Sequence, residues 1–185
     1  MQRASELMNS QVVDLDTGKI KGRVIDLLFS LQNGAIEGLL LKLPLKRYAL
    51  GFVEIKGVKS LGKDGVTVFK AEGIKKWQQK KPDGIRFKPL MTQTGNLIGH
   101  ITDVIIDENN YCVLGLEVSK SLFEDLKRGR QLWLISPEMT QGDVVLVPEN
   151  CQSVGADRLL EHSRRLLSLA NNTKTEAVCF LNRRD

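Results

Sequence analysis

A repeat with an offset of 77 residues constrains the fold of this chain more than any other feature of its sequence. Several residues between positions 17 and 39 return unchanged between positions 94 and 116, at a constant offset and without a gap. The repeated residues are Thr17, Gly18, Gly22, Asp26, Asn33, Gly38 and Leu39 in the first copy and Thr94, Gly95, Gly99, Asp103, Asn110, Gly115 and Leu116 in the second. Solenoid repeats have periods of about 20 to 50 residues and need three or more units. Two copies at this longer offset therefore predict two duplicated small domains.

Both copies have the pattern of short strands separated by turns. Strands are expected at 12–15, 20–30, 35–43, 48–55 and 65–69 in the first copy and at 87–91, 97–107, 111–119, 131–135 and 143–147 in the second. Asn33-Gly34 is typical of a hairpin turn, because both central residues of a type I′ turn have positive φ. The sequence therefore predicts an all-β chain, with each copy a five- or six-stranded meander that forms a small barrel or sandwich.

Alternation along equivalent strands separates a buried face from an outer face. It places Leu39 and Leu116 on the buried face, so Leu40 and Glu117 are expected to point outward. A solvent-facing glutamate is ordinary. Leu40 is interpreted as an isolated surface leucine, as a residue covered by a loop, or as a contact for a partner.

Two glycine-containing segments carry a family resemblance. Residues 16–29 read DTGKIKGRVIDLLF, and residues 94–107 read TGNLIGHITDVIID. The pair resembles the opening hairpin of the PRC-barrel family. Four further segments are similar to the closing strands of that family: 52–55, 58–68, 134–137 and 142–147. The resemblance covers residues 3–150 and implies two small PRC-type β-barrels in tandem.

The resemblance also implies a class of function. PRC-barrels occur in the cytoplasmic part of the photosynthetic reaction-centre H subunit, in the ribosome-maturation factor RimM and as free-standing bacterial and archaeal proteins, and they mostly act by docking onto other macromolecules. It therefore implies a non-enzymatic adaptor or assembly factor for a larger complex, photosynthetic or ribosomal by family analogy. The chain has neither the membrane helix of the H subunit nor the other domain of RimM, so neither activity transfers residue by residue.

The residues of the repeated motif are explained by structure without a ligand. Gly18 and Gly95 are expected at positive φ in tight turns, and glycine at 22 and 99 permits a bulge or a close strand crossing. Asp26 and Asp103 are expected to accept hydrogen bonds from nearby backbone amides. All six are therefore interpreted as structural residues of the turns and strands rather than as catalytic ones.

Metal and enzyme chemistry find little support in the sequence. The chain has two histidines and three cysteines, with no HExxH and no CxxC motif. No nucleophile and base pair can be assembled from the two histidines. We therefore expect no catalytic residues, no metal, no cofactor and no small-molecule substrate.

Charge is unevenly distributed along a chain whose formal net charge is +5. Residues 1–75 hold twelve basic and eight acidic residues, whereas residues 89–150 hold four basic and nine acidic ones. The candidate partner-binding residues other than Leu40 belong to the basic part: Lys42, Lys46, Arg47, Lys75, Lys76, Trp77, Lys80 and Lys81. Such a surface suits an acidic protein, an RNA backbone or an anionic lipid surface. The alternative is a solvated linker whose tryptophan packs between the barrels.

The domain layout follows from these patterns. Barrel 1 is assigned to 1–75, a basic linker to 76–84 and barrel 2 to 85–150. Leucines and arginines then alternate in a helical stripe, which predicts an amphipathic helix at 155–171, followed by a tail at 172–185. No apolar stretch approaches the length of a membrane span or a signal sequence. We expect a cytoplasmic protein, with a location peripheral to a membrane as the alternative.

Three functions remain after these exclusions. The first is the adaptor that docks onto a protein complex. The second is an RNA-associated or ribosome-associated maturation factor that uses the basic linker, and the third is a peripheral protein that touches anionic lipid through Trp77 and its lysines. The sequence identifies neither the partner nor the oligomeric state.

Overall fold

The computed structural model describes residues 1–44, 49–69, 73–78, 84–121, 125–126, 129–155 and 161. These residues form strands and two short 3-10 turns, η1 (Ala4–Leu7) and η2 (Ile55–Gly57), which confirms the all-β class. The chain divides into an N-terminal unit, Gln2–Phe29 with Ile36–Gly84, and a C-terminal unit, Met1 and Ser30–Ala35 with Ile85–Asp185. The predicted helix at 155–171, apart from residues 155 and 161, and the tail at 172–185 lie outside the described residues.

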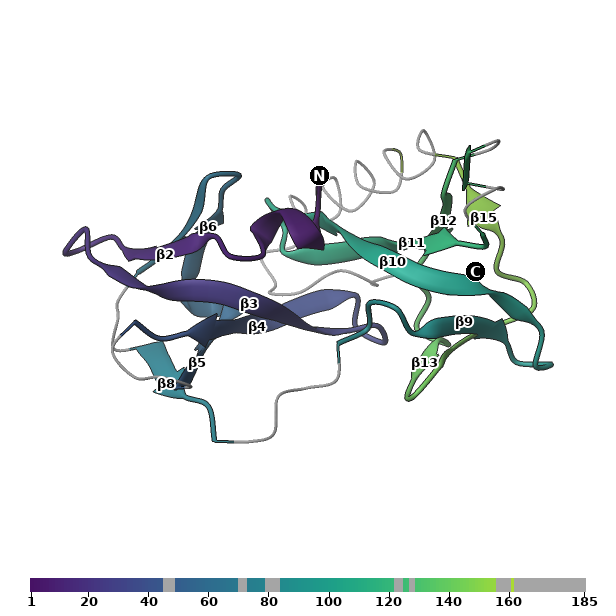
Figure 1. Ribbon diagram of the computed structural model, residues 1–185, viewed down its shortest axis with the longest axis horizontal. Helices are drawn as coiled ribbons and strands as arrows, with labels where there is room; N and C mark the ends of the chain where they lie inside the picture. Colours follow the sequence, from purple (N-terminus) through teal and green to yellow (C-terminus); the bar gives the residue numbers. More distant parts are fainter. Residues whose placement is uncertain are drawn as a thin grey trace, which may run out of the picture. The chain divides into compact units, whose positions relative to one another are not determined.

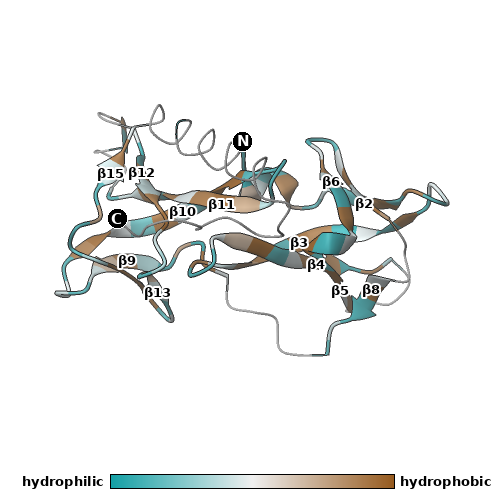
Figure 2. Ribbon diagram, turned by 180° about the vertical axis from the view of Figure 1, so that it is seen from behind, coloured by the Kyte–Doolittle hydropathy of each residue, from teal (hydrophilic) through white to brown (hydrophobic). Residues whose placement is uncertain are grey.

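The N-terminal unit is a curled sheet (Figure 1). Its strands are β1 (Gln2–Arg3), β2 (Gln11–Asp14), β3 (Ile20–Ser30), β4 (Ala35–Lys42), β5 (Leu50–Glu54), β6 (Val58–Leu61), β7 (Gly65–Val68) and β8 (Ile74–Lys76). Hydrogen-bonded neighbours follow the order β8, β5, β4, β3, β2, β7 and β6. Hydrophilic and hydrophobic residues alternate along β3 (Figure 2), as a strand with one covered face requires.

The C-terminal unit repeats this order strand by strand. Its strands are β9 (Pro89–Thr92), β10 (Leu97–Asp107), β11 (Cys112–Ser119), β12 (Gln131–Leu134), β13 (Thr140–Gln141), β14 (Val145–Val147) and β15 (Ser153–Val154). Neighbours follow the order β15, β12, β11, β10, β9, β14 and β13. The two units therefore share one topology.

Neither unit is the simple meander that the turn pattern predicts. The last hairpin returns to the first strand, so that β7 pairs in parallel with β2, and β14 in parallel with β9. A further short strand is added beside β5 in one unit and beside β12 in the other. Both departures have the same physical origin, because a curled sheet is more stable when its outer strands find backbone partners.

The core of each unit lies where its first strand meets its last hairpin. Val12 is in register with Val66 in the N-terminal unit, and Leu90 is in register with Val145 in the C-terminal unit. All four side chains are fully buried. Equivalent positions of the two copies therefore fill equivalent places in the two cores.

The repeated glycines take two structural roles. Gly18 and Gly95 have φ of 65° and 88°, the left-handed conformation that glycine adopts without a steric penalty. Gly22 and Gly99 instead lie against backbone. A Cβ atom at residue 22 would be 2.7 Å from the Lys42 carbonyl oxygen, and one at residue 99 would be 2.4 Å from the carbonyl oxygen of Ser119. The first strand of each hairpin thus crosses the end of the second at a separation that excludes a side chain.

The repeated aspartates bind the backbone beside them. The Leu27 amide donates to Asp26 Oδ1 at 3.0 Å, and the Val104 amide donates to Asp103 Oδ1 at 2.9 Å. In both copies the carboxylate accepts from the next residue in the chain.

The repeat contains a one-residue difference just before its conserved part. The Asp14 amide donates to the Lys19 carbonyl, whereas the equivalent turn runs from the Thr92 amide to the Asn96 carbonyl and is one residue shorter. The offset is therefore 77 residues after the turn and 78 before it. Residue 9 of the first copy consequently corresponds to residue 87 of the second: the Asn9 amide donates to Val24, and the Phe87 amide to Ile101.

We predict that Gly99→Ala lowers the free energy of unfolding by about 2 kcal/mol, because β10 must move away from the Ser119 carbonyl. Gly73→Ala is the matched control, since a Cβ there meets nothing within 4 Å, and its stability should stay within about 0.5 kcal/mol of the wild type. Urea denaturation followed by circular dichroism measures both. Equal midpoints for the two variants would show that the crossing tolerates a side chain.

Candidate interaction surfaces

Three strands of the N-terminal unit bring together part of the predicted basic surface. Lys42 on β4 is in register with Leu50 on β5, and the Trp77 amide donates to the Leu50 carbonyl at 2.9 Å. Phe52, two residues along β5, is in register with Lys75 on β8. Residues 42, 75 and 77 therefore share one sheet face, on strands that are far apart in sequence.

The other predicted basic residues separate from this group. Lys76 is exposed and in register with Gly51, so it lies on the opposite face of β8. Lys46, Arg47, Lys80 and Lys81 lie outside the described residues.

Trp77 packs on the N-terminal unit rather than standing free among lysines. Its ring centroid lies 5.5 Å from that of Phe52, with 51° between the ring planes, and its side chain is half-buried. This tilted arrangement is a favoured aromatic pair geometry. The ring of Phe52 in turn occupies the space that a side chain at Gly38 would fill.

A carboxylate partly compensates the lysines of this face. Glu54 Oε1 lies 2.5 Å from Lys75 Nζ, and its Oε2 lies 2.6 Å from Lys56 Nζ. The hydrogen bonds from Lys56 and Lys75, together with their positive charges, lower the pKa of Glu54 from 4.5 to about 2. The carboxylate is therefore ionised at neutral pH, and it makes this surface less positive than the lysine count indicates.

Leu40 is not available to a partner, which corrects the prediction that it is a partner-binding residue. Its side chain is fully buried. Glu117, expected in solvent at the equivalent position, is buried as well, with 2% of its surface exposed. Alternation identifies which residues share a sheet face but does not show whether that face meets solvent. In both copies this face is covered at this strand.

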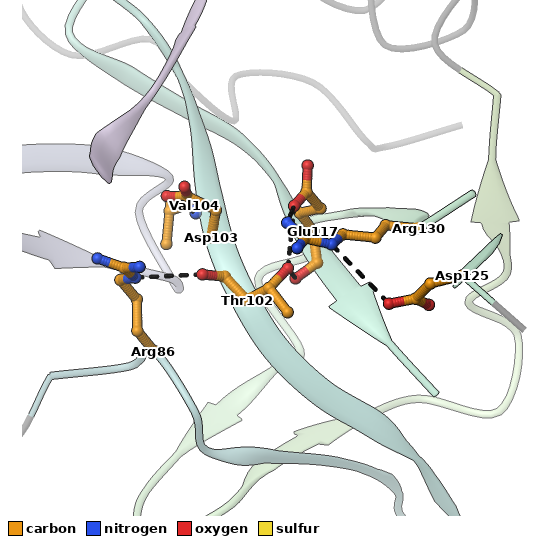
Figure 3. Close-up of polar contacts among 7 residues, drawn as sticks. All are labelled: Arg86, Thr102, Asp103, Val104, Glu117, Asp125 and Arg130. Atoms are coloured by element: carbon orange, nitrogen blue, oxygen red, sulfur yellow. Dashed lines mark hydrogen bonds and ion pairs between the residues drawn. The ribbon is translucent and has the colours of Figure 1, made fainter. Parts of the chain in front are cut away.

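The buried Glu117 is held by a polar network in the C-terminal unit (Figure 3). Thr102, at a bulge of β10, donates its hydroxyl toward Glu117 Oε1 at 3.0 Å and the Glu117 carbonyl at 3.1 Å. Arg130 NH1 donates to the same Oε1 at 2.5 Å, and Arg130 Nε lies 3.9 Å from Asp125. Arg86 Nε donates to the Thr102 carbonyl at 3.1 Å. The network fastens three loops or strands to β11, and we interpret it as structural.

Exposed apolar side chains gather beside the first turn of each unit. In the N-terminal unit, Ile20 is in register with Val13, and Leu15 and Phe69 follow the paired residues Asp14 and Val68. Leu15, Ile20 and Phe69 are each close to half exposed. We call Leu15, Ile20 and Phe69, with the half-buried Val13, the N-terminal turn patch.

The C-terminal unit has the equivalent patch. Leu97 is in register with Met91, which is in register with Leu146. Leu97 is 60% exposed, and the other two are half-buried. These three residues form the C-terminal turn patch. The sequence analysis missed both patches, although the repeat places Ile20 and Leu97 at matching positions.

Phe87 is an exposed aromatic residue in an unfavourable backbone conformation. Its φ is 71°, and 73% of its surface is exposed. The Arg86 guanidinium lies 5.4 Å from the ring centroid. Asn9, its counterpart in the first copy, has φ of 65°, and asparagine tolerates this conformation much better than phenylalanine. The one-residue difference in the turn conceals this pair in the sequence.

Two searches of the described residues complete the survey. Within the described ranges, no cluster of three or more His, Cys, Asp or Glu side chains is arranged to hold a metal ion. None of the helices described is both long and apolar enough to cross a membrane.

Two curled sheets of one topology, with a shared glycine crossing, define a tandem repeat of a small all-β domain. The model of the PRC-barrel domain matches the chain in two segments, residues 1–74 and 85–162. The chain belongs to the PRC-barrel family, as its glycine motifs indicate. Comparison with curated proteins found no matching sequence.

We predict that the Glu54 carboxyl titrates at a pKa of about 2 in the folded protein and that the double change Lys56→Gln with Lys75→Gln returns it toward 4.5. Because the pKa is lowered in the folded state, the ion pairs stabilise the fold above pH 4.5, and that contribution is lost as the pH falls toward 2. Carbon-detected NMR titration of the carboxyl measures it. Lys63→Gln, at an exposed lysine elsewhere in the unit, is the control, and a pKa unmoved by the double change would contradict the assignment.

Proposed function

We propose that this tandem PRC-barrel protein is a non-enzymatic adaptor or assembly factor that docks onto a larger protein complex. By family analogy that complex is photosynthetic or ribosomal. The protein is placed in the cytoplasm, with a location peripheral to a membrane as the alternative. Support comes from side chains that remain exposed although the fold does not need them in that position.

Phe87 is the observation that carries this proposal. A non-glycine residue in the left-handed region costs about 1 kcal/mol, and a phenylalanine gains little in return while most of its ring is in water. Its contact with Arg86 offsets about 0.5 to 1 kcal/mol of this cost. The other copy meets the same backbone requirement with Asn9. An exposed aromatic ring beside a guanidinium is typical of the residues that dominate protein interfaces.

A second candidate function is binding to RNA or to an anionic membrane surface. It is favoured by Lys42 and Lys75, which share one face of the N-terminal unit with Trp77. The packing of Trp77 on Phe52 and the pairing of Lys75 with Glu54 reduce what this face offers to a base or a headgroup. Protein docking therefore remains the preferred function.

We predict that Phe87→Asn raises or leaves unchanged the stability of the chain, by up to about 1 kcal/mol, while it abolishes capture of the partner. Stability rises because asparagine accepts a positive φ, and binding falls because the aromatic anchor is lost. Thermal unfolding measures the first effect. Affinity capture of the tagged full chain from its native cell, with quantitative mass spectrometry, measures the second.

Leu126→Asn is the matched control, since Leu126 is an exposed apolar residue that belongs to none of these surfaces. It should retain the same stoichiometric partner as the wild type. A partner that survives Phe87→Asn would contradict the role of this residue, and the absence of any stoichiometric protein would contradict the adaptor. Ribonuclease sensitivity or vesicle flotation of the captured material, weakened steeply by salt, would favour the second candidate.

A further inference from the structure

The two turn patches keep the same place in the fold but differ in their charged surroundings. Around the N-terminal turn patch, Lys59 Nζ lies 5.6 Å from the centroid of the Phe69 ring, and Lys19 is exposed in the turn itself. Asp16 is exposed beside it, while Lys21 lies 3.5 Å from the buried Asp14. Two lysines and one aspartate outside that ion pair give this patch a positive rim.

The C-terminal turn patch has a carboxylate in the corresponding place. Glu149 Oε1 accepts hydrogen bonds from the Thr94 hydroxyl at 2.5 Å and from the Thr94 amide at 3.3 Å. The turn at 93–96 contains no charged residue. Lys88, whose ammonium donates to the Gly142 carbonyl, and exposed His100 and Asp143 belong to the next row of the sheet. The rim beside the turn is therefore negative.

We propose that the N-terminal turn patch of one molecule binds the C-terminal turn patch of a second copy of this chain. Leu15, Ile20 and Phe69 would bury their exposed apolar surface against Leu97 and its neighbours, which supplies affinity. Lys19 and Lys59 would face Glu149, which supplies orientation and favours encounter. The excess of basic residues at 1–75 and of acidic residues at 89–150 has the same sense.

Charge selects this pairing over a contact between identical patches. Two N-terminal turn patches would bring Lys19 and Lys59 of one molecule toward the same lysines of the other. A contact between unlike patches is heterologous and leaves one patch of each type for a further copy. This contact does not depend on the proposed adaptor function, which uses Phe87 outside both patches.

Sedimentation velocity of the full chain tests for the contact. The weight-average mass should rise with protein concentration between about 1 and about 300 µM at about 50 mM salt, a range suited to a modest interface. About 500 mM salt should weaken the association, because exposed ion pairs are screened. A mass that stays monomeric over the whole range would overturn the proposal.

A complementation experiment tests which patches meet. Ile20→Ser and Leu97→Ser each remove one patch, and each variant alone should associate at least about tenfold more weakly than the wild type. Mixed in equal amounts, they should form heterodimers that do not grow further, because each heterodimer joins the two intact patches and leaves the two altered ones. Both positions are exposed, and thermal unfolding should confirm that both variants remain folded.

The controls separate this contact from other modes of association. Leu126→Ser, at an exposed leucine outside both patches, should associate like the wild type. A Leu97→Ser variant that still associates fully, while Ile20→Ser does not, would show contact between identical N-terminal patches and overturn the proposal. A mixture of Ile20→Ser and Leu97→Ser that remains monomeric would overturn it equally.

Discussion

The close strand crossing at Gly22 and Gly99 is the constraint on which each unit depends. At these positions the long first strand of the hairpin lies so near to a carbonyl oxygen at the end of its partner that no Cβ fits between them. Register shifts in the same part of β3 and β10 show how the strands accommodate the approach. The curl that follows brings the last hairpin back to the first strand, where the parallel pairs β2 with β7 and β9 with β14 enclose the core.

Duplication preserved this framework and left the outer surfaces to diverge. Leu40 and Glu117 occupy one buried position with opposite chemistry, and the glutamate is accommodated by Thr102 and Arg130. Asn9 and Phe87 likewise share a left-handed backbone, but only asparagine suits it. Where the two copies differ in chemistry at one backbone position, stability alone does not explain the choice of residue. Such positions are where an interaction with other molecules is to be sought.

Much of the framework was predictable from local chemistry. The turn at Gly18, the crossing at Gly22 and the hydrogen bond to Asp26 each need a particular residue type, so their recurrence 77 residues later identified two similar domains. The two strands added at β8 and β15 were not predicted, because their two or three residues leave too short a pattern. The candidate site was predicted less well. Lys42, Lys75 and Trp77 do share a face, but Leu40 is buried.

The sequence by itself determined the duplication, the all-β class and the positions where glycine is obligatory, because these depend on the conformations that single residues can adopt. Only the tertiary structure decided which side chains reach solvent. Burial depends on which strands, distant in the chain, come to lie beside a given residue. For that reason Leu40, which alternation directed outward, is covered, and Ile20, Leu97 and Phe87 are exposed.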